Sequence, residues 1–454
     1  MTASGEHDMP ESTSERPGGT ASCAGLDLGE LAGEAHARMA SFTRSQASTG
    51  AELVLSASRR LSLEYEVGTG RVSLSRGESV SAAARVWREE GSGFASLSVG
   101  DADDLGRVLS EAWERGRTGA RSPLPALPAP TEPPRSLPGL SAAQAREQAE
   151  HLARTVLPPG VVVQAAVLTY SASGSVLVRG EGIVQGHVDA RREAIVRCET
   201  SRGAVVDGVA APLGEPWDLE PLRARLARAV DALEGPAEAA DPGLPLVLRP
   251  AVAAPLVAAL SWMLRGDVAA ATPALARAVG KKLFPSVLSV EDDPRHPLGA
   301  WRRSEDDEGA PARPLRLVDE GRFLGFLHSA ATAALLGVVP NGRGLRSEGS
   351  PPTPSALGLF VVPRADALPE HYTELVARVE TFTTMPRPGV VSLMAGGWEV
   401  RRGQRVRRLA PVELRLPVLE TLRALRGVGA DLAFFPTADG CGTPTLLLPP
   451  LLGG

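Results

Sequence analysis

Residues 315–327 have the sequence LRLVDEGRFLGFL, in which two apolar runs flank Asp319-Glu320-Gly321. Glycine readily adopts the left-handed backbone of a tight turn, so this stretch predicts two short strands joined by a turn. Upstream, residues 252–264 (VAAPLVAALSWML) are apolar nearly all round, which is typical of a buried helix. The two stretches predict a C-terminal domain, residues 246–454, built mainly of antiparallel strands around one buried helix.

The preceding half is predicted to be an α+β domain of a sheet plus helices, residues 26–235. Its expected helices are 28–48, 104–115, 141–156 and 219–233. Its expected strands are 52–58, 61–67, 81–87, 161–170, 175–179 and 193–200. An acidic, proline-bearing break at 234–245 separates it from the larger C-terminal domain, which gives an α+β fold class overall.

Two further segments have compositions that disfavour regular structure. Residues 1–25 are rich in Ser, Thr, Gly, Glu and Pro, which predicts a disordered tail. Residues 122–138 contain many prolines, which predicts an extended surface connection within the N-terminal domain.

Composition excludes several classes of protein. The net charge of −5 over 454 residues gives no general attraction to nucleic acid or to an anionic membrane. Cys23, Cys198 and Cys441 are too widely separated for a CxxC metal site. No apolar run approaches the ~20 residues that span a bilayer, and the N-terminal residues lack an apolar signal-peptide core. We therefore expect a cytoplasmic protein.

Several local motifs follow one another between residues 266 and 363. In chain order they are Glu291-Asp292-Asp293-Pro294, Glu305-Asp306-Asp307-Glu308-Gly309, the strand pair 315–327, Asn341-Gly342-Arg343-Gly344 and Ser350-Pro351-Pro352-Thr353-Pro354-Ser355. This order resembles the C-terminal domain of the TldD/PmbA metallopeptidase family. The resemblance marks Asp292, Asp293, Asp306, Asp307, Glu308, Gly309, Pro351 and Pro354 as family-motif residues whose roles remain unassigned.

The zinc motif of the TldD branch is missing from this chain. Members of that branch carry His-Glu-x-x-x-His on the helix before the Gly-Asp that opens this region, where imidazoles hold zinc and the glutamate takes a proton from metal-bound water. Here Val257 and Trp262 occupy the histidine positions and Ala258 the glutamate position, and the chain contains no His-Glu dipeptide. The chain is therefore similar to the PmbA/TldE branch, which lacks the motif.

The resemblance implies a non-catalytic subunit that pairs with a TldD-like, zinc-bearing chain in a heterodimer. Such a pair would act in proteolysis of small unfolded peptides or in peptide maturation, with zinc in the partner and no cofactor in this chain, so that this chain is a pseudoenzyme. One alternative is a stand-alone peptide-binding or scaffold protein, and another is a hydrolase with an unrelated site. The segment 387–393 departs from the branch's pattern, which leaves the peptide contacts open.

Other polar groups have both a functional and a plain interpretation. His371 and Glu374 have the spacing of a metal pair on a helix, but the surrounding residues favour a strand, and surface polar residues are the preferred interpretation. Cys441 lies where TldD-type chains supply a zinc ligand, although a partly buried thiol is preferred. The acidic run 305–308 could bind a cation. A solvated loop that turns at Gly309 is preferred there.

Two more features complete the set of candidates. His328 beside Ser329 could indicate an activated nucleophile, but no third residue is placed by the sequence, so a histidine at a hairpin end is preferred. The basic run 401–408 (RRGQRVRR) could bind an acidic partner or nucleic acid. A solvated β-hairpin is the preferred interpretation.

Overall fold

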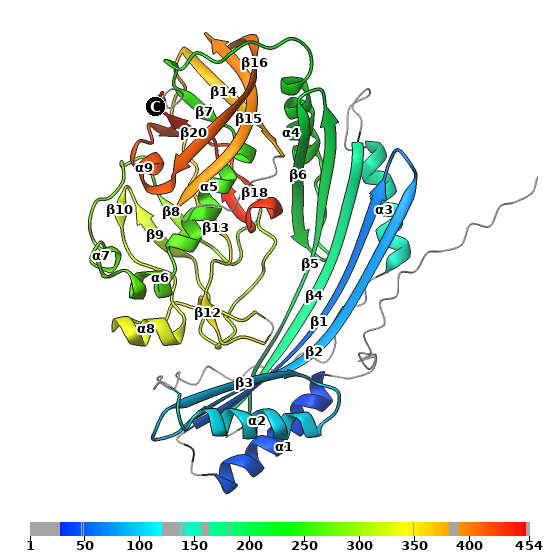
Figure 1. Cartoon of the computed structure of the whole chain (residues 1–454), viewed down its shortest axis with the longest axis vertical. Helices are drawn as coiled ribbons and strands as arrows, with labels where there is room; N and C mark the ends of the chain where they lie inside the picture. The colour runs from blue at the N-terminus through cyan, green and yellow to red at the C-terminus, as the bar shows by residue number, and fades with distance from the viewer. Residues whose placement is uncertain are drawn as a thin grey trace, which may run out of the picture.

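The computed structural model describes residues 28–46, 48, 50–119, 137–138, 141–155, 163–179, 182–347, 349–380 and 389–450. The predicted tail (1–25), most of the proline-rich connection and residues 387–388 lie outside these ranges. The fold is α+β with mainly antiparallel sheets, as predicted (Figure 1). Long strands of the N-terminal half sweep past the C-terminal half, and two helices cover their lower end (Figure 1).

The N-terminal half contributes six antiparallel strands in the order β6-β5-β4-β1-β2-β3. Their bounds are β1 Gly50–Glu66, β2 Arg71–Trp87, β3 Ser92–Ser98, β4 Val163–Arg179, β5 Gly182–Thr200 and β6 Gly203–Pro212. The prediction of separate strands at 52–58 and 61–67 was wrong, because β1 continues through Arg59 and Arg60. Arg59 lies opposite Glu78 of β2, at 3.4 Å, so an ion pair across the strands replaces apolar alternation there.

Four helices pack against this half of the sheet, close to the predicted ranges. They are α1 Leu28–Ser45, α2 Asp103–Arg115, α3 Ala142–Thr155 and α4 Glu220–Leu233. Helices α1 and α2 bury apolar residues such as Met39 and Leu105 against the lower part of the strands. Helices α3 and α4 bury residues such as Leu152 and Leu226 in a second core. Each helix has apolar residues at helical spacing on one side, which explains why the sequence predicted them.

The C-terminal half adds strands to the same sheet and builds a second one. Six strands extend the large sheet: β7 Leu246–Leu248, β14 His371–Val379, β15 Val390–Arg401, β16 Gln404–Pro417, β17 Gly427–Val428 and β20 Leu446–Leu448. The second sheet has the order β10-β9-β8-β13-β19-β18. Its strands are β8 Val290–Asp292, β9 Leu315–Asp319, β10 Arg322–Phe323, β13 Leu359–Val361, β18 Ala433–Phe435 and β19 Cys441–Thr443.

The remaining elements of this half are short. They are α6 Gly266–Ala271, α7 Pro273–Ala276, α8 Ala330–Leu336, α9 Val418–Arg423, the 3-10 turn η1 Pro436–Ala438 and the strand pair β11 Gly344–Leu345 with β12 Thr353–Pro354. Strand β8 begins at Val290, after a turn formed by Pro285 to Leu288. The strand-turn-strand prediction for 315–327 is confirmed, with Glu320 and Gly321 at positive φ in the turn.

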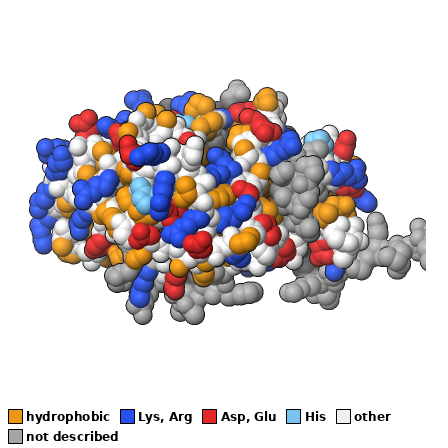
Figure 2. All heavy atoms as spheres, turned by 90° about the horizontal axis from the view of Figure 1, so that it is seen from above, with side chains coloured by type: hydrophobic (Ala, Val, Ile, Leu, Met, Phe, Trp, Pro, Cys, Tyr) orange, Lys and Arg blue, Asp and Glu red, His pale blue; other side chains and the backbone are white. Residues whose placement is uncertain are grey.

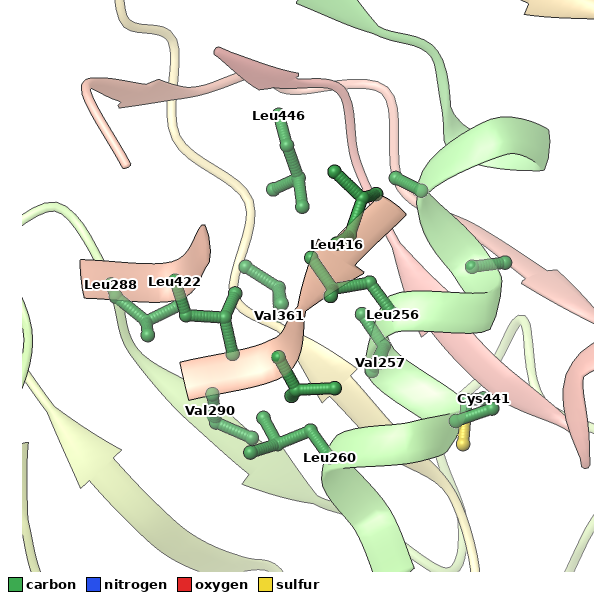
Figure 3. Close-up of a cluster of buried hydrophobic side chains, with 14 of the residues drawn as sticks. Leu256, Val257, Leu260, Leu288, Val290, Val361, Leu416, Leu422, Cys441 and Leu446 are labelled. Atoms are coloured by element: carbon green, nitrogen blue, oxygen red, sulfur yellow. The ribbon is translucent and has the colours of Figure 1, made fainter. Parts of the chain in front are cut away.

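The helix predicted to be buried is α5, Pro250–Met263, and it forms the core of the C-terminal half (Figure 3). Leu256, Val257 and Leu260 are all at most 1% exposed. Pro250 starts the helix where its missing N–H costs no hydrogen bond. None of the described helices is both long enough and apolar enough to cross a membrane.

Candidate functional site

The helix positions that would carry a zinc motif hold apolar side chains in α5. Val257 is fully buried in the core, and Ala258 is 9% exposed. Trp262 is 58% exposed at the far end of the helix, where its indole Nε1 donates to Asp439 Oδ2 at 3.3 Å. The guanidinium of Arg265 lies 4.8 Å from the Trp262 ring. These side chains fill the positions with packing and stacking contacts and offer no metal ligand.

Cys441 lies in β19 beside α5, with its sulfur close to the helix (Figure 3). Burial raises the pKa of this thiol, and the charges of Asp439 and Asp292 raise it further, against a hydrogen bond with Ser261. A zinc ligand must be a thiolate, so this environment favours the protonated, non-ligating form. The prediction of a small thiol is confirmed, and the thiol is fully rather than partly buried.

The α5 region therefore does not fit zinc. Val257 would have to be an imidazole, yet it is packed in an apolar core, and Cys441 is held protonated. Within the ranges that the structure describes, no group of three or more His, Cys, Asp or Glu side chains is arranged to hold a metal ion.

A cleft of about 340 Å³ lies between the long sheet and the C-terminal half, next to the end of α5. Its lining residues are Arg191, Glu193, Ala210, Ala300, Trp301, Phe434, Phe435, Pro436, Asp439 and Gly440. Asp439, the acceptor of the Trp262 indole, connects the cleft to α5. The site is thus formed by residues far apart in the sequence.

The cleft combines charges with aromatic surface. Arg191 and Glu193 project from the same face of β5, 3.0 Å apart. The Arg191 guanidinium lies 4.4 Å from the Trp301 ring centroid, a cation–π contact. The sequence did not reveal these residues. The available signals were the alternation of Arg191 and Glu193 on one strand and the rarity of tryptophan.

The acidic run 305–308 is largely buried, so its interpretation as a solvated loop was wrong. Asp306 is 1% exposed, and it accepts hydrogen bonds from the backbone N–H groups of Glu308, Ala310 and Gly344 at 3.0, 2.8 and 2.8 Å. Burial, together with the charge of Glu308, raises the pKa of Asp306 to about 7 despite these hydrogen bonds. The turn at Gly309, with φ of 83°, is confirmed.

Two more carboxylates of the run, Asp307 and Glu308, belong to a buried ionic cluster that we call the charged junction: Glu52, Arg85, Arg179, Arg303, Asp307, Glu308 and Arg346. Glu52 is 1% exposed and lies 2.6, 3.1 and 2.8 Å from Arg85, Arg179 and Arg346. Burial alone would raise the pKa of Glu52, but these arginines outweigh it and lower the pKa to about 2. The cluster therefore ties the N-terminal strands to the C-terminal half.

Asp307 and Glu308 are the links from the acidic run to this junction. Asp307 pairs with Arg303 at 3.0 Å, and although burial opposes it, the charge of Arg303 holds the pKa of Asp307 well below its usual range. Glu308 lies 3.3 Å from Arg85 and accepts from the N–H of Ala330, at the start of α8, at 2.7 Å. These carboxylates have a positioning role that their sequence did not reveal.

The remaining family-motif residues divide into buried and surface positions. Asp292 and Arg343 form an ion pair in which both side chains are 0% exposed, and Asp292 also accepts from Leu357 and Gly358 at 3.0 and 2.7 Å. Asp293 is half-buried and accepts from Arg295 at 2.9 Å. Pro351 is exposed, and Pro354 is buried in β12.

His371 and Glu374 lie on strand β14, so the expectation of a strand rather than a helix at these residues is confirmed. Glu374 is 2% exposed, however, so its interpretation as a surface residue was wrong. It is buried because Arg249 and Arg405 neutralise it at 2.6 and 2.9 Å.

His328 and Ser329 form a structural motif at the start of α8. The Ser329 hydroxyl accepts from the N–H of Thr332 and so caps the helix. His328 is 6% exposed and lies 3.4 Å from the Thr332 hydroxyl rather than acting on the serine. The serine therefore has a capping role.

The basic run 401–408 forms the predicted hairpin, between β15 and β16, with Arg402 and Gly403 at positive φ. Arg407 and Arg408 pair with Glu238 and Asp231, each at 2.6 Å. On the face seen from above, basic and acidic side chains are interspersed (Figure 2). Arg407 and Arg408 of this hairpin are therefore paired with acidic side chains.

Residues 243–451 match the family model of the PmbA/TldA metallopeptidase C-terminal domain. The C-terminal half of the chain therefore carries a TldD/PmbA family domain. A metalloprotease of Synechocystis sp. is 28% identical to it over 170 residues, a match that spans 36% of each protein. The family resemblance of the motifs between residues 266 and 363 is confirmed.

Solved structures show the same fold along almost the whole chain. TldE from Thermococcus kodakarensis has a TM-score of 0.74 at 20% identity, covering 91% of this chain and 98% of TldE. A candidate modulator of a DNA gyrase from Thermotoga maritima has a TM-score of 0.74 at 17% identity, covering 92% and 98%. The chain thus shares its fold with proteins of low sequence identity.

Proposed function

We propose that the chain is a non-catalytic, TldE-like subunit that pairs with a TldD-like, zinc-bearing chain to form a peptidase. The observation that carries the proposal is helix α5, where Val257, Ala258 and Trp262 stand at the zinc-motif positions within an otherwise intact family fold. Catalysis by metal-bound water requires ligands and a base at those positions. In this proposal the catalytic zinc and its ligands come from the partner.

The cleft beside α5 supports a role in binding peptide. It has a volume of about 340 Å³ and presents both charged and aromatic groups, which is typical of sites that orient a ligand. In the proposed pair, this chain contributes binding surface to small unfolded peptides while its partner cleaves them. A cytoplasmic location remains an expectation that accompanies the proposal.

The test is a pull-down of the tagged full-length chain from its native extract, with mass spectrometry of the bound proteins. We expect a chain with His-Glu-x-x-x-His to co-purify near one to one, and the pair to lose peptidase activity on chelation. The tagged chain alone should be inactive. Recovery of the chain by itself would refute the subunit proposal and favour a stand-alone peptide-binding protein. Chelator-resistant peptidase activity of the pure chain would indicate an unrelated hydrolytic site.

A matched pair of variants shows whether α5 itself supplies catalysis. Trp262→Ala and Ala258→Ser both change zinc-motif positions without adding a metal ligand of the required kind. If catalysis resides in the partner, neither variant should lower the turnover number of the reconstituted pair by more than about twofold. A loss of turnover on the scale of 10²-fold or more, as expected for a group that acts on the reacting atoms, would place catalytic chemistry in this chain.

A further inference from the structure

A second pocket, which we call the serine pocket, lies on the long sheet beside Arg346, Ser347, Gly349 and Ser350. Its volume is about 160 Å³. Six of its lining residues are serines of three adjacent strands: Ser56 and Ser58 of β1, Ser79 and Ser81 of β2, and Ser173 and Ser175 of β4. Among the described residues, no Phe, Tyr or Trp side chain lines it.

The six serines form two rows across the strands. The first row joins Ser81, Ser56 and Ser175, which are direct register partners, and continues to His187 of β5. The second row joins Ser79, Ser58 and Ser173 in the same way and continues to Asp189. Neighbouring strands lie about 4.8 Å apart, and alternate residues of one strand about 7 Å apart. The pocket floor is therefore a regular array of hydroxyl groups.

The Ser81 hydroxyl faces the pocket. Ser81 is 8% exposed and lines the pocket, and within the described part of the chain its hydroxyl makes no hydrogen bond. A ligand in the pocket could therefore form a hydrogen bond with it in place of water.

The histidine at the end of the first row joins the pocket to the charged junction. His187 Nε2 lies 2.8 Å from Arg303 Nη2 and 3.3 Å from Asp307 Oδ1. Nδ1 lies 3.1 Å from the Ser175 hydroxyl, and the tautomer of the ring decides which of the two donates. In either tautomer the Ser175 hydroxyl keeps a donor or acceptor site for a ligand.

The charges that line the pocket are already neutralised. Arg303 pairs with Asp189 and Asp307 at 2.5 and 3.0 Å, and Arg346 pairs with Glu52 at 2.8 Å. An anion would therefore gain little from these guanidinium groups. A sugar ring or a nucleobase would find no Phe, Tyr or Trp ring to stack on among the described lining residues. A ligand that both donates and accepts hydrogen bonds without net charge fits best.

We infer that the serine pocket binds an extended, uncharged peptide segment through hydrogen bonds between its hydroxyls and the peptide backbone. In an extended chain, equivalent backbone groups recur about every 7 Å, which matches the spacing of the serines along each strand. His187 of the pocket and Arg191 and Glu193 of the cleft beside α5 are alternate residues on one face of β5. The inference takes its ligand class from the proposed function.

The test is equilibrium dialysis of the full-length chain against a tritium-labelled hexapeptide of alternating alanine and glycine with blocked ends. The variant Ser56→Ala/Ser81→Ala/Ser175→Ala removes one row of hydroxyls and should weaken binding at least about tenfold. Ser73→Ala/Ser75→Ala is the matched control. Both serines are exposed on the strand and face that carry Ser81, but they lie outside the pocket, so the affinity of this variant for the peptide should stay within about twofold of that of the unmodified chain.

Any one of three results would overturn the inference. They are no binding of the peptide by the unmodified chain, binding by the row variant as tight as by the unmodified chain, and displacement of the peptide by inorganic phosphate. If the triple variant unfolds, Ser81→Ala alone should still weaken binding about threefold. The partner pull-down is run on the same variants. Peptide binding that the row variant weakens, with no partner recovered in the pull-down, would contradict only the proposed function, whereas partner binding with unaltered peptide affinity in the row variant would contradict only this inference.

Discussion

Helix α5 and the charged junction differ in the side chains that they bury: those of α5 are apolar, and those of the junction are ionic. The zinc-motif positions of α5 are occupied by apolar side chains, and Val257 is completely buried. At the charged junction, seven ionisable groups remain and are paired almost entirely out of solvent. The ionic groups of this chain therefore connect its two halves. Helix α5, which would carry the zinc motif, is instead packed as part of the hydrophobic core.

The largest expected effect comes from removing one member of a fully buried pair. Asp292→Ala leaves Arg343 buried without its carboxylate and should lower the free energy of unfolding by about 3–5 kcal/mol. Urea denaturation measures this. Asp293→Ala, one residue along and only half-buried, should cost about 1 kcal/mol or less. Equal costs for the two variants would contradict the view that burial of the ion pair is decisive.

The second effect is a pH dependence at the charged junction. Because the pKa of Glu52 is lowered to about 2 in the folded chain, its contribution is fully present above its usual value near 4.5 and is lost as the pH falls toward 2. The loss amounts to about 3 kcal/mol.

Glu52→Gln should therefore flatten the dependence of unfolding free energy on pH in that window, as measured by urea titrations at several pH values. Glu64→Gln is the control, because this exposed glutamate lies on the same strand and face. If the unmodified chain loses no more stability than Glu52→Gln between pH 4.5 and 2, the ionic role of the junction is wrong.

On α5 the effect should follow apolar packing. Val257→Ala removes two buried methyl-sized groups and should lower the free energy of unfolding by roughly 2 kcal/mol, independent of pH. Thermal unfolding followed by circular dichroism at two pH values measures both properties. A stabilising effect would mean that Val257 is strained in its present packing.

The smallest effect is expected at the other end of the same helix. Trp262→Ala removes an indole that is 58% exposed, with one hydrogen bond to Asp439 and one contact with Arg265. Its cost should be about 1 kcal/mol or less in the same measurement. A cost comparable to that of Val257→Ala would show that the Trp262 contacts carry more of the core's stability than its exposure indicates.

The sequence allowed the fold class, the helices and the buried character of α5 to be predicted, because each depends on local apolar spacing. The burial of Asp306, Glu308 and Glu374 could not be predicted, since their partners lie elsewhere in the chain: Gly344, Arg85 and Arg249. A run of carboxylates looks solvated unless its arginines are known. The cleft residues Arg191 and Trp301 come together only through the packing of the two halves.

The pairing of β7 with β20 bears on how this protein can be rearranged. Leu246 lies opposite Leu448 in an antiparallel ladder, so the polypeptide enters and leaves the C-terminal half at neighbouring points. A unit whose ends meet can be moved, permuted or fused as a cassette without threading its chain. For construction of chimeras, residues 243–451 form a natural module, and a short linker from its end back to its start would create new termini elsewhere with little disturbance of the core.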